Sequence, residues 1–398
     1  MDNIRNKNEI LKDKEIYTET SLINIKKSSN EKGHTFTVSH TQIAKGISSL
    51  MLLYHHLLRP GNKFIKHLKN ELIFFGIDFR RYTSVFFKIT TCSYTFLSGI
   101  GIYYSLNKFK SIKNMYIKCI RNFLRLMIIF WIILIFAYPK GLHTRLFNLN
   151  YSTIISCIFA DYKRKGNWWY IRMHFALLIY SPLFVRLFQD INYKNKILPF
   201  TTFYFFYFII RYIQHSYKFR GILINILFHY FKYFSEIDII LSFFVGILSA
   251  KYDLISIYHN SKPESIYYSL FSILSAVFIR CNLITQEGST KIDFFIVPLF
   301  IMPITSIIYK NKYFSSLFKL FGKHSTNFWF IHGYFYDNYY IDLLAYPKYS
   351  CICYIWLIIL TLISSYIINI VLIPIINYIN SKGCNYIGYF HFLNNKAI

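Results

Sequence analysis

Long apolar segments separated by short polar loops constrain this sequence more than any other feature. Their lengths match what an α-helix needs to cross all or most of a hydrocarbon core of ~30 Å. The segments lie at 43–60, 83–106, 119–139, 168–188, 197–213, 237–250, 265–284, 293–309, 321–338 and 352–379. In lipid, a helix satisfies its own backbone hydrogen bonds within one segment. The sequence therefore predicts an all-α, polytopic integral membrane protein with about ten transmembrane helices.

The composition agrees with a membrane protein. Of the 398 residues, 54% are hydrophobic, 21% aromatic and only 16% charged, which is too apolar for an ordinary soluble domain of this length. The formal net charge is +27, and the excess Lys and Arg are spread through the loops between apolar segments. This distribution is typical of cations that flank membrane segments and contact anionic lipids, and it argues against a nucleic-acid partner.

We expect three regions along the chain. Residues 1–40 are polar and nearly neutral, which favours a mostly disordered cytoplasmic tail. Residues 41–380 form the membrane domain, and residues 381–398 form a short C-terminal tail. The N-terminus lacks the pattern of a cleaved signal peptide. The seven cysteines form no CxxC pair and have no histidine at metal-ligand spacing, so no metal site is expected.

The first apolar segment carries a cation and an imidazole on one face. Lys45 and His56 are eleven positions apart, which at 100° per residue leaves them about 20° apart around a helix. Ser48, Ser49 and Leu52 share this face, whereas His55 points elsewhere. The rise between Lys45 and His56 is roughly 16 Å, about half of a hydrocarbon core. A cation near the membrane surface would thus share one stripe with an imidazole near mid-depth.

Two interpretations of these residues stay open from position alone. Ionisable groups inside membrane helices are costly, so His56 is either a general base near its natural titration range or a hydrogen-bond partner of another helix. Lys45 is either a topology anchor or part of an anion site. Arg121 and Arg125, one turn apart at the start of the third segment, are likewise either membrane-flanking markers or phosphate ligands.

A second informative stretch is LFGKHSTNFWFIHGYF at 320–335. Ser325 and His332 are seven positions apart and therefore share a helix face, with His332 deep in the segment. His332 either contributes to a site or makes an interhelical hydrogen bond. His324 lies beside the glycine near the start of the segment and is expected at the interface.

Six short motifs, in order along residues 41–380, resemble the bacterial membrane-bound acyltransferase-3 family. They are Lys45 with His56; Phe96–Gly99; Arg121 with Arg125; Trp169, Tyr170, Tyr180 and Pro182; FFVGILSAK at 243–251; and GKHSTNFWFIH at 322–332. The family usually carries Arg at the position of Lys45. Lysine keeps the charge but cannot make the planar two-pronged contact of a guanidinium with phosphate.

The resemblance implies an O-acyltransferase of the bacterial cytoplasmic membrane. It would move an acyl group, typically acetyl, from acyl-CoA as co-substrate to a hydroxyl of a surface glycan or its lipid-linked precursor, with no permanently bound cofactor. His56 would be catalytic, Lys45, Arg121 and Arg125 would bind the donor, and Ser325 and His332 would position the acceptor. A non-enzymatic polysaccharide transporter or flippase is the alternative, since it would also be polytopic, aromatic and basic.

Overall fold

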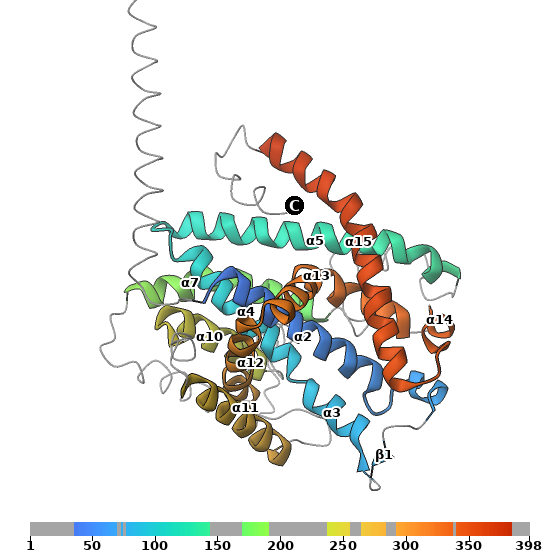
Figure 1. The fold of residues 1–398 in the computed structure, drawn as a ribbon. Helices are drawn as coiled ribbons and strands as arrows, with labels where there is room; N and C mark the ends of the chain where they lie inside the picture. Colours follow the sequence, from blue (N-terminus) through green and yellow to red (C-terminus); the bar gives the residue numbers. More distant parts are fainter. Residues whose placement is uncertain are drawn as a thin grey trace, which may run out of the picture.

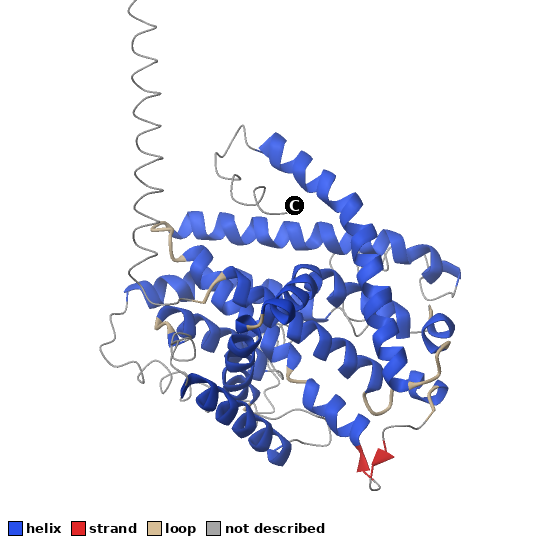
Figure 2. Cartoon of the chain, in the orientation of Figure 1, coloured by secondary structure: helices blue, strands red, loops and turns tan. Residues whose placement is uncertain are grey.

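The computed structural model is all-helical, with about ten helices and one short β-hairpin (Figures 1 and 2). It describes residues 36–69, 73–74, 77–143, 169–190, 237–254, 264–283, 292–336 and 340–383. The elements are α2 (Val38–Leu58), η1 (Lys63–His67), β1 (Ile73–Phe74), β2 (Ile77–Asp78), α3 (Phe79–Phe87), α4 (Thr90–Leu106), α5 (Ile112–His143), α7 (Trp169–Asp190), α10 (Ile237–Lys251), α11 (Glu264–Leu283), α12 (Asp293–Lys310), α13 (Lys312–Tyr336), α14 (Ile341–Ala345) and α15 (Ser350–Gly383).

Nine of the ten predicted apolar segments coincide with described helices. The remaining segment, 197–213, lies outside the described residues, as do most of the predicted N-terminal tail and nearly all of the C-terminal tail. The predicted segment 83–106 is divided between α3 and α4, because a tight turn at Lys88 separates them: its backbone N–H donates to the carbonyls of Phe86 and Val85. Together α3 and α4 still form one apolar stretch of 28 residues.

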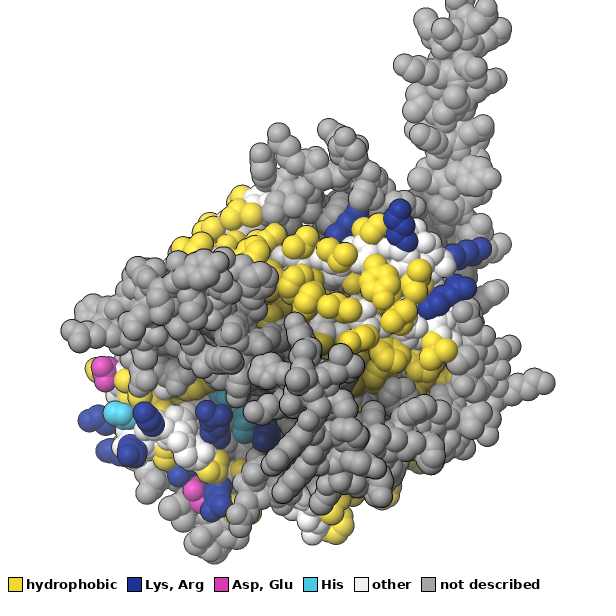
Figure 3. Space-filling view, turned by 180° about the vertical axis from the view of Figure 1, so that it is seen from behind, with side chains coloured by type: hydrophobic (Ala, Val, Ile, Leu, Met, Phe, Trp, Pro, Cys, Tyr) yellow, Lys and Arg dark blue, Asp and Glu magenta, His cyan; other side chains and the backbone are white. Residues whose placement is uncertain are grey.

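Within the described residues, four helical stretches are long and apolar enough to cross a membrane: Phe79–Leu106, Ile266–Leu283, Asp293–Lys310 and Ser350–Ile375. The most apolar windows of Ile266–Leu283 and Ser350–Ile375 are only 17% and 28% buried, against 61% for Phe79–Leu106. Ile266–Leu283 and Ser350–Ile375 are therefore peripheral, whereas Phe79–Leu106 is central. Exposed apolar side chains also form a band across the upper part of Figure 3, with Lys and Arg beside it, as expected for a lipid-facing surface.

Two pairs of helices approach each other closely at glycines. An added Cβ at Gly46 of α2 would overlap the Phe318 carbonyl oxygen of α13, and one at Gly322 of α13 would overlap the Gln42 carbonyl oxygen of α2. Gly99 of α4 and the opposing helix α10 meet in the same way. Small residues let backbones approach where lipid supplies no hydrophobic drive to association. The close packing of α2 on α13 fixes the relative position of their polar faces.

The helices α2 and α13 run in the same direction. Gly46 of α2 lies against Gly322 of α13, and ten residues further along each helix His56 lies against His332. Parallel packing is what the predicted topology requires of the first and ninth segments, which cross the membrane in the same sense. Residues at equal distances from the two glycines therefore lie at the same level of the bundle.

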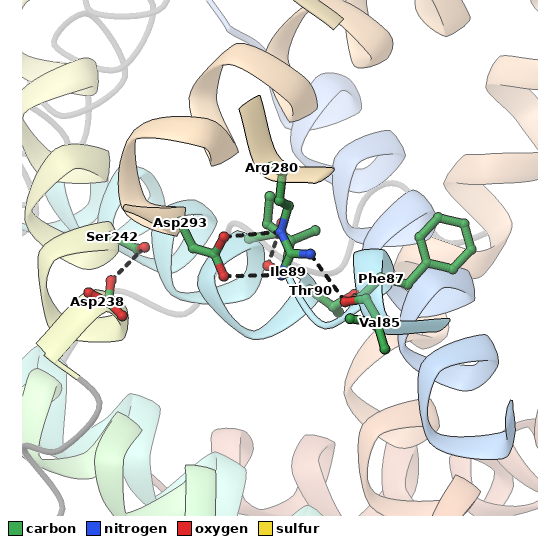
Figure 4. Close-up of polar contacts among 9 residues, drawn as sticks. Val85, Phe87, Ile89, Thr90, Asp238, Ser242, Arg280 and Asp293 are labelled. Carbon is green, nitrogen blue, oxygen red and sulfur yellow. Dashed lines mark hydrogen bonds and ion pairs between the residues drawn. The ribbon is translucent and has the colours of Figure 1, made fainter. Parts of the chain in front are cut away.

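A buried ion pair joins α11, α12 and α3 (Figure 4). The Arg280 guanidinium donates from Nε to Asp293 Oδ1 at 3.0 Å, from Nη2 to Asp293 Oδ2 at 3.2 Å and from Nη1 to the Val85 carbonyl at 3.1 Å. Arg280 is fully buried, at 0% exposure. Its two-pronged geometry and third hydrogen bond offset the desolvation of both charges. This pair fixes α3, and with it the far end of α2.

Candidate active site

The helix α2 presents the predicted polar stripe to the interior of the bundle. It begins with a capping box in which the Thr37 hydroxyl accepts from the His40 backbone N–H and the His40 ring accepts from the Thr37 backbone N–H. Ser48 and Ser49 are buried, and Lys45 and His56 are half-buried. The Ser49 hydroxyl donates to the Lys45 carbonyl at 2.7 Å and lies 2.6 Å from the Tyr94 hydroxyl of α4.

His56 and His332 are brought together at the far end of this stripe. Their ring centroids are 5.0 Å apart, and the Tyr336 ring stacks on His56 at 6.0 Å and lies 5.6 Å from His332. Nδ1 of His56 and Nε2 of His332 are both buried and have no hydrogen-bond partner among the described residues. Buried polar atoms without partners are uncommon in folded proteins and are expected where a ligand supplies the missing hydrogen bond.

The hydrogen bond of His332 assigns its tautomer. Nδ1 lies 2.9 Å from the Phe328 carbonyl oxygen, which can only accept, so Nδ1 carries the proton in the neutral ring. Nε2 then presents a lone pair. His332 can thus accept a hydrogen bond from a hydroxyl placed between it and His56.

The predicted cations gather at the opposite end of the stripe. Arg125 of α5 is close enough to Lys45 for electrostatic interaction. Arg121 and Arg125 both interact with Lys118 of the same helix. We call these four cationic side chains the basic cluster: Lys45, Lys118, Arg121 and Arg125. Like charges repel one another, so such a group is stabilised by an anion that bridges them.

Aromatic and hydroxyl-bearing side chains lie between the two ends, and sequence reasoning missed most of them. The Trp329 ring of α13 lies 4.6 Å from Tyr170 and 5.4 Å from Tyr94. Tyr170 in turn stacks on His174 of α7 at 5.9 Å, and His174 interacts electrostatically with Lys45. Nε1 of Trp329 and Nδ1 of His174 are buried without hydrogen-bond partners in the described part of the chain.

The other candidate residues have more ordinary surroundings. Ser325 is buried at 4% exposure on α13, two turns before His332, roughly 10 Å along the helix axis. It therefore lies nearer the level of Ser49 than of His56. The predicted interfacial depth of His324 stays a prediction, but its side chain has a partner: its Nδ1 is 2.7 Å from the Ser365 hydroxyl, which also accepts from Asn327 Nδ2 at 2.8 Å. This polar group joins α13 to α15 within the bundle.

His55 has a structural partner. Its Nδ1 donates to the Ser84 carbonyl at 2.7 Å, and the Ser84 hydroxyl donates back to the His55 carbonyl at 3.2 Å. These reciprocal hydrogen bonds tie α2 to α3 on the side away from His332. Adjacent histidines in one sequence thus serve different faces of the helix, as their 100° separation predicts.

Comparison of the chain with protein-family models, curated proteins and solved structures found no match. The resemblance of the six motifs to the acyltransferase-3 family therefore stays a prediction. The structure places the motif residues in a basic cluster and a pair of imidazoles at the two ends of the α2 stripe, with aromatic side chains of α4, α7 and α13 between them.

Proposed function

We propose that this protein is a membrane O-acyltransferase that moves an acyl group, acetyl by resemblance, from acyl-CoA to a hydroxyl of a cell-surface glycan or its lipid-linked precursor. About ten transmembrane helices in the bacterial cytoplasmic membrane are part of this proposal. One observation carries it: α2 joins Lys45 in the basic cluster to His56, whose imidazole lies against that of His332.

The donor is assigned to the basic cluster. Acyl-CoA carries several phosphates at one end and a thioester at the other, separated by the extended pantetheine arm. Lys45, Arg121 and Arg125 supply the cations that phosphates require, and guanidinium groups can bind them in two-pronged fashion. With its phosphates held there, the donor can extend its arm along the lining of Tyr94, Tyr170 and Trp329 toward His56.

The chemistry is assigned to the imidazole pair. His56 removes the proton from an acceptor hydroxyl as its oxygen attacks the thioester carbonyl carbon. A C–O bond forms, the C–S bond breaks, and the proton passes from His56 to the departing CoA thiolate. His332 accepts a hydrogen bond at Nε2 and positions the acceptor, with Ser325 further along the same face. Holding both reactants beside one base is the main source of rate.

The test compares surface glycans made with and without the protein. Mass spectrometry should find ester-linked acyl groups that depend on the chain and that disappear with His56→Ala. His55→Ala is the matched control, because it removes a neighbouring imidazole that faces Ser84 instead of His332. Glycans without chain-dependent esters, or esters that persist in His56→Ala, would refute the proposal; glycan export that is independent of both acyl-CoA and His56 would favour a transporter.

A further inference from the structure

The far end of α2 continues into a basic cap. We define the cap as the described residues of 59–81 together with 340–349, which include η1, the β-hairpin and α14. This part of the chain contains seven Lys and Arg residues but only two Asp residues. Asp78 is already paired with Arg80 at 3.1 Å. The lysines Lys63, Lys66 and Lys69 remain exposed, so the cap has a surplus of accessible positive charge.

Membrane topology does not account for this surplus. Cytoplasmic loops are normally the ones enriched in Lys and Arg. The opposite end of the bundle, with Lys45, already carries basic loops that include Lys108, Lys310 and Lys312. If that end meets cytoplasmic acyl-CoA, the basic cap lies on the outer side, where such enrichment is not expected. Figure 3 shows Lys, Arg and His side chains gathered at the lower left, the end where η1 and the hairpin lie.

The basic cap is a folded structure over the centre of the bundle. Phe64 of η1 and Leu344 of α14 are both fully buried, at 0% exposure, and the Lys69 backbone N–H donates to the Lys348 carbonyl at 2.9 Å. The helix α2 beneath it is surrounded by α3, α4, α12, α13 and α15. Lysines that directly follow α2 therefore lie over the helix ends, away from the lipid perimeter.

Cations of this region lie near the imidazole pair, and the region also carries exposed aromatic rings. Arg59 interacts electrostatically with both His56 and His332, and Lys88 of the following turn interacts with His56. Tyr82, just beyond the hairpin, is 65% exposed, and Tyr346 in the cap is 84% exposed. Flat aromatic faces pack against the C–H groups of sugar rings, whereas lysines and arginines bind carboxylates and phosphates.

We propose that the basic cap is the docking surface for the acceptor, and that the acceptor is an acidic glycan with carboxylate or phosphate groups along its sugars. This inference rests on the proposed function, because it identifies the substrate class for the same site. The lysines would hold the charged sugars outside the membrane, while a neighbouring hydroxyl enters between His56 and His332.

Binding to the purified full-length chain in neutral detergent tests this inference. The probes are carboxymethyl-dextran and neutral dextran of equal length. We expect the acidic polymer to bind at least tenfold tighter at low salt and to lose this advantage as salt screens the charges. The variant Lys63→Gln/Lys66→Gln/Lys69→Gln should weaken its binding roughly tenfold. Arg81→Gln, on α3, is a second variant that should weaken binding less.

The matched control removes three lysines from the opposite end of the chain, Lys310→Gln/Lys312→Gln/Lys323→Gln, and should leave binding within about twofold. Equal binding of both dextrans, or equal loss in both triple variants, would overturn the inference. If Lys63→Gln/Lys66→Gln/Lys69→Gln lost co-purifying phosphatidylglycerol but kept its dextran binding, that result would also overturn the inference and assign the cap to lipid head groups. Because dextran binding is measured without acyl-CoA, failure of docking is distinguishable from failure of the acyl-transfer chemistry.

Discussion

Replacing Gly46 with alanine should force α2 and α13 apart. The added Cβ would overlap the Phe318 carbonyl oxygen and lie 3.0 Å from its carbonyl carbon and 3.2 Å from the Gly322 backbone nitrogen. All three of these α13 atoms are backbone, so no side-chain rotation can relieve the overlap. The helices must separate by about 1 Å, and a gap of this size forfeits up to about half of the dispersion attraction between facing atoms.

The expected cost is about 1–3 kcal/mol, the range for overpacked interiors. Gly101 on α4 offers a matched control because an added Cβ there meets nothing within 4 Å. Gly101→Ala should gain about 0.5–1 kcal/mol, since alanine loses less backbone freedom than glycine when a helix forms. The two variants should therefore differ by about 1.5–4 kcal/mol in the free energy of unfolding.

Unfolding in mixed detergent micelles, followed by circular dichroism, measures both variants against the unaltered protein. The Gly46→Ala protein that does fold should also transfer acyl groups more slowly. Separation of α2 from α13 would widen the 5.0 Å distance between the ring centroids of His56 and His332. If Gly46→Ala proved as stable as Gly101→Ala, the close helix contact would be wrong, and the alignment of the two polar faces would lose its support.

Three further predictions concern side chains around the site. Arg280→Met should cost about 3–5 kcal/mol by leaving the buried Asp293 carboxylate without its guanidinium partner, and adding Asp293→Leu should recover much of the folded yield in size-exclusion chromatography; no recovery would contradict the buried ion pair. His55→Ala should lower stability by about 1–3 kcal/mol in thermal unfolding while the folded fraction keeps its acyl transfer, and a loss of activity would move the catalytic role. Asn327→Ala should cost a similar amount by unpairing groups of α15, and an unchanged melting temperature would argue against that network.

Sequence periodicity located most of the helices but not all of their roles. The 100° step per residue correctly separated His55 from His56, because helix geometry is local and independent of what packs around it. Apolar length predicted nine described helices. The split at Lys88 was not predicted, since an interruption of one turn leaves the apolar pattern of 83–106 intact.

The lining between the two ends could not be found from sequence. Tyr94, Tyr170 and Trp329 come from three helices far apart in the chain, and aromatic residues are so frequent here, at 21%, that none of them is conspicuous. His174 carried a signal, as an ionisable group inside an apolar segment. The contact of His324 with Ser365 of α15 was not predicted, because its distance from the segment start said nothing about the helix that packs against it.

Steady-state kinetics of the reconstituted protein, with acyl-CoA varied at a fixed acceptor concentration, test the central claim most directly. If Lys45 binds donor phosphate and His56 carries the chemistry, Lys45→Gln should raise KM for acyl-CoA with little change in kcat, whereas His56→Ala should lower kcat by about 10²-fold or more. The same change in both parameters for both variants, or full activity in either, would contradict an account in which the two ends of α2 have different tasks.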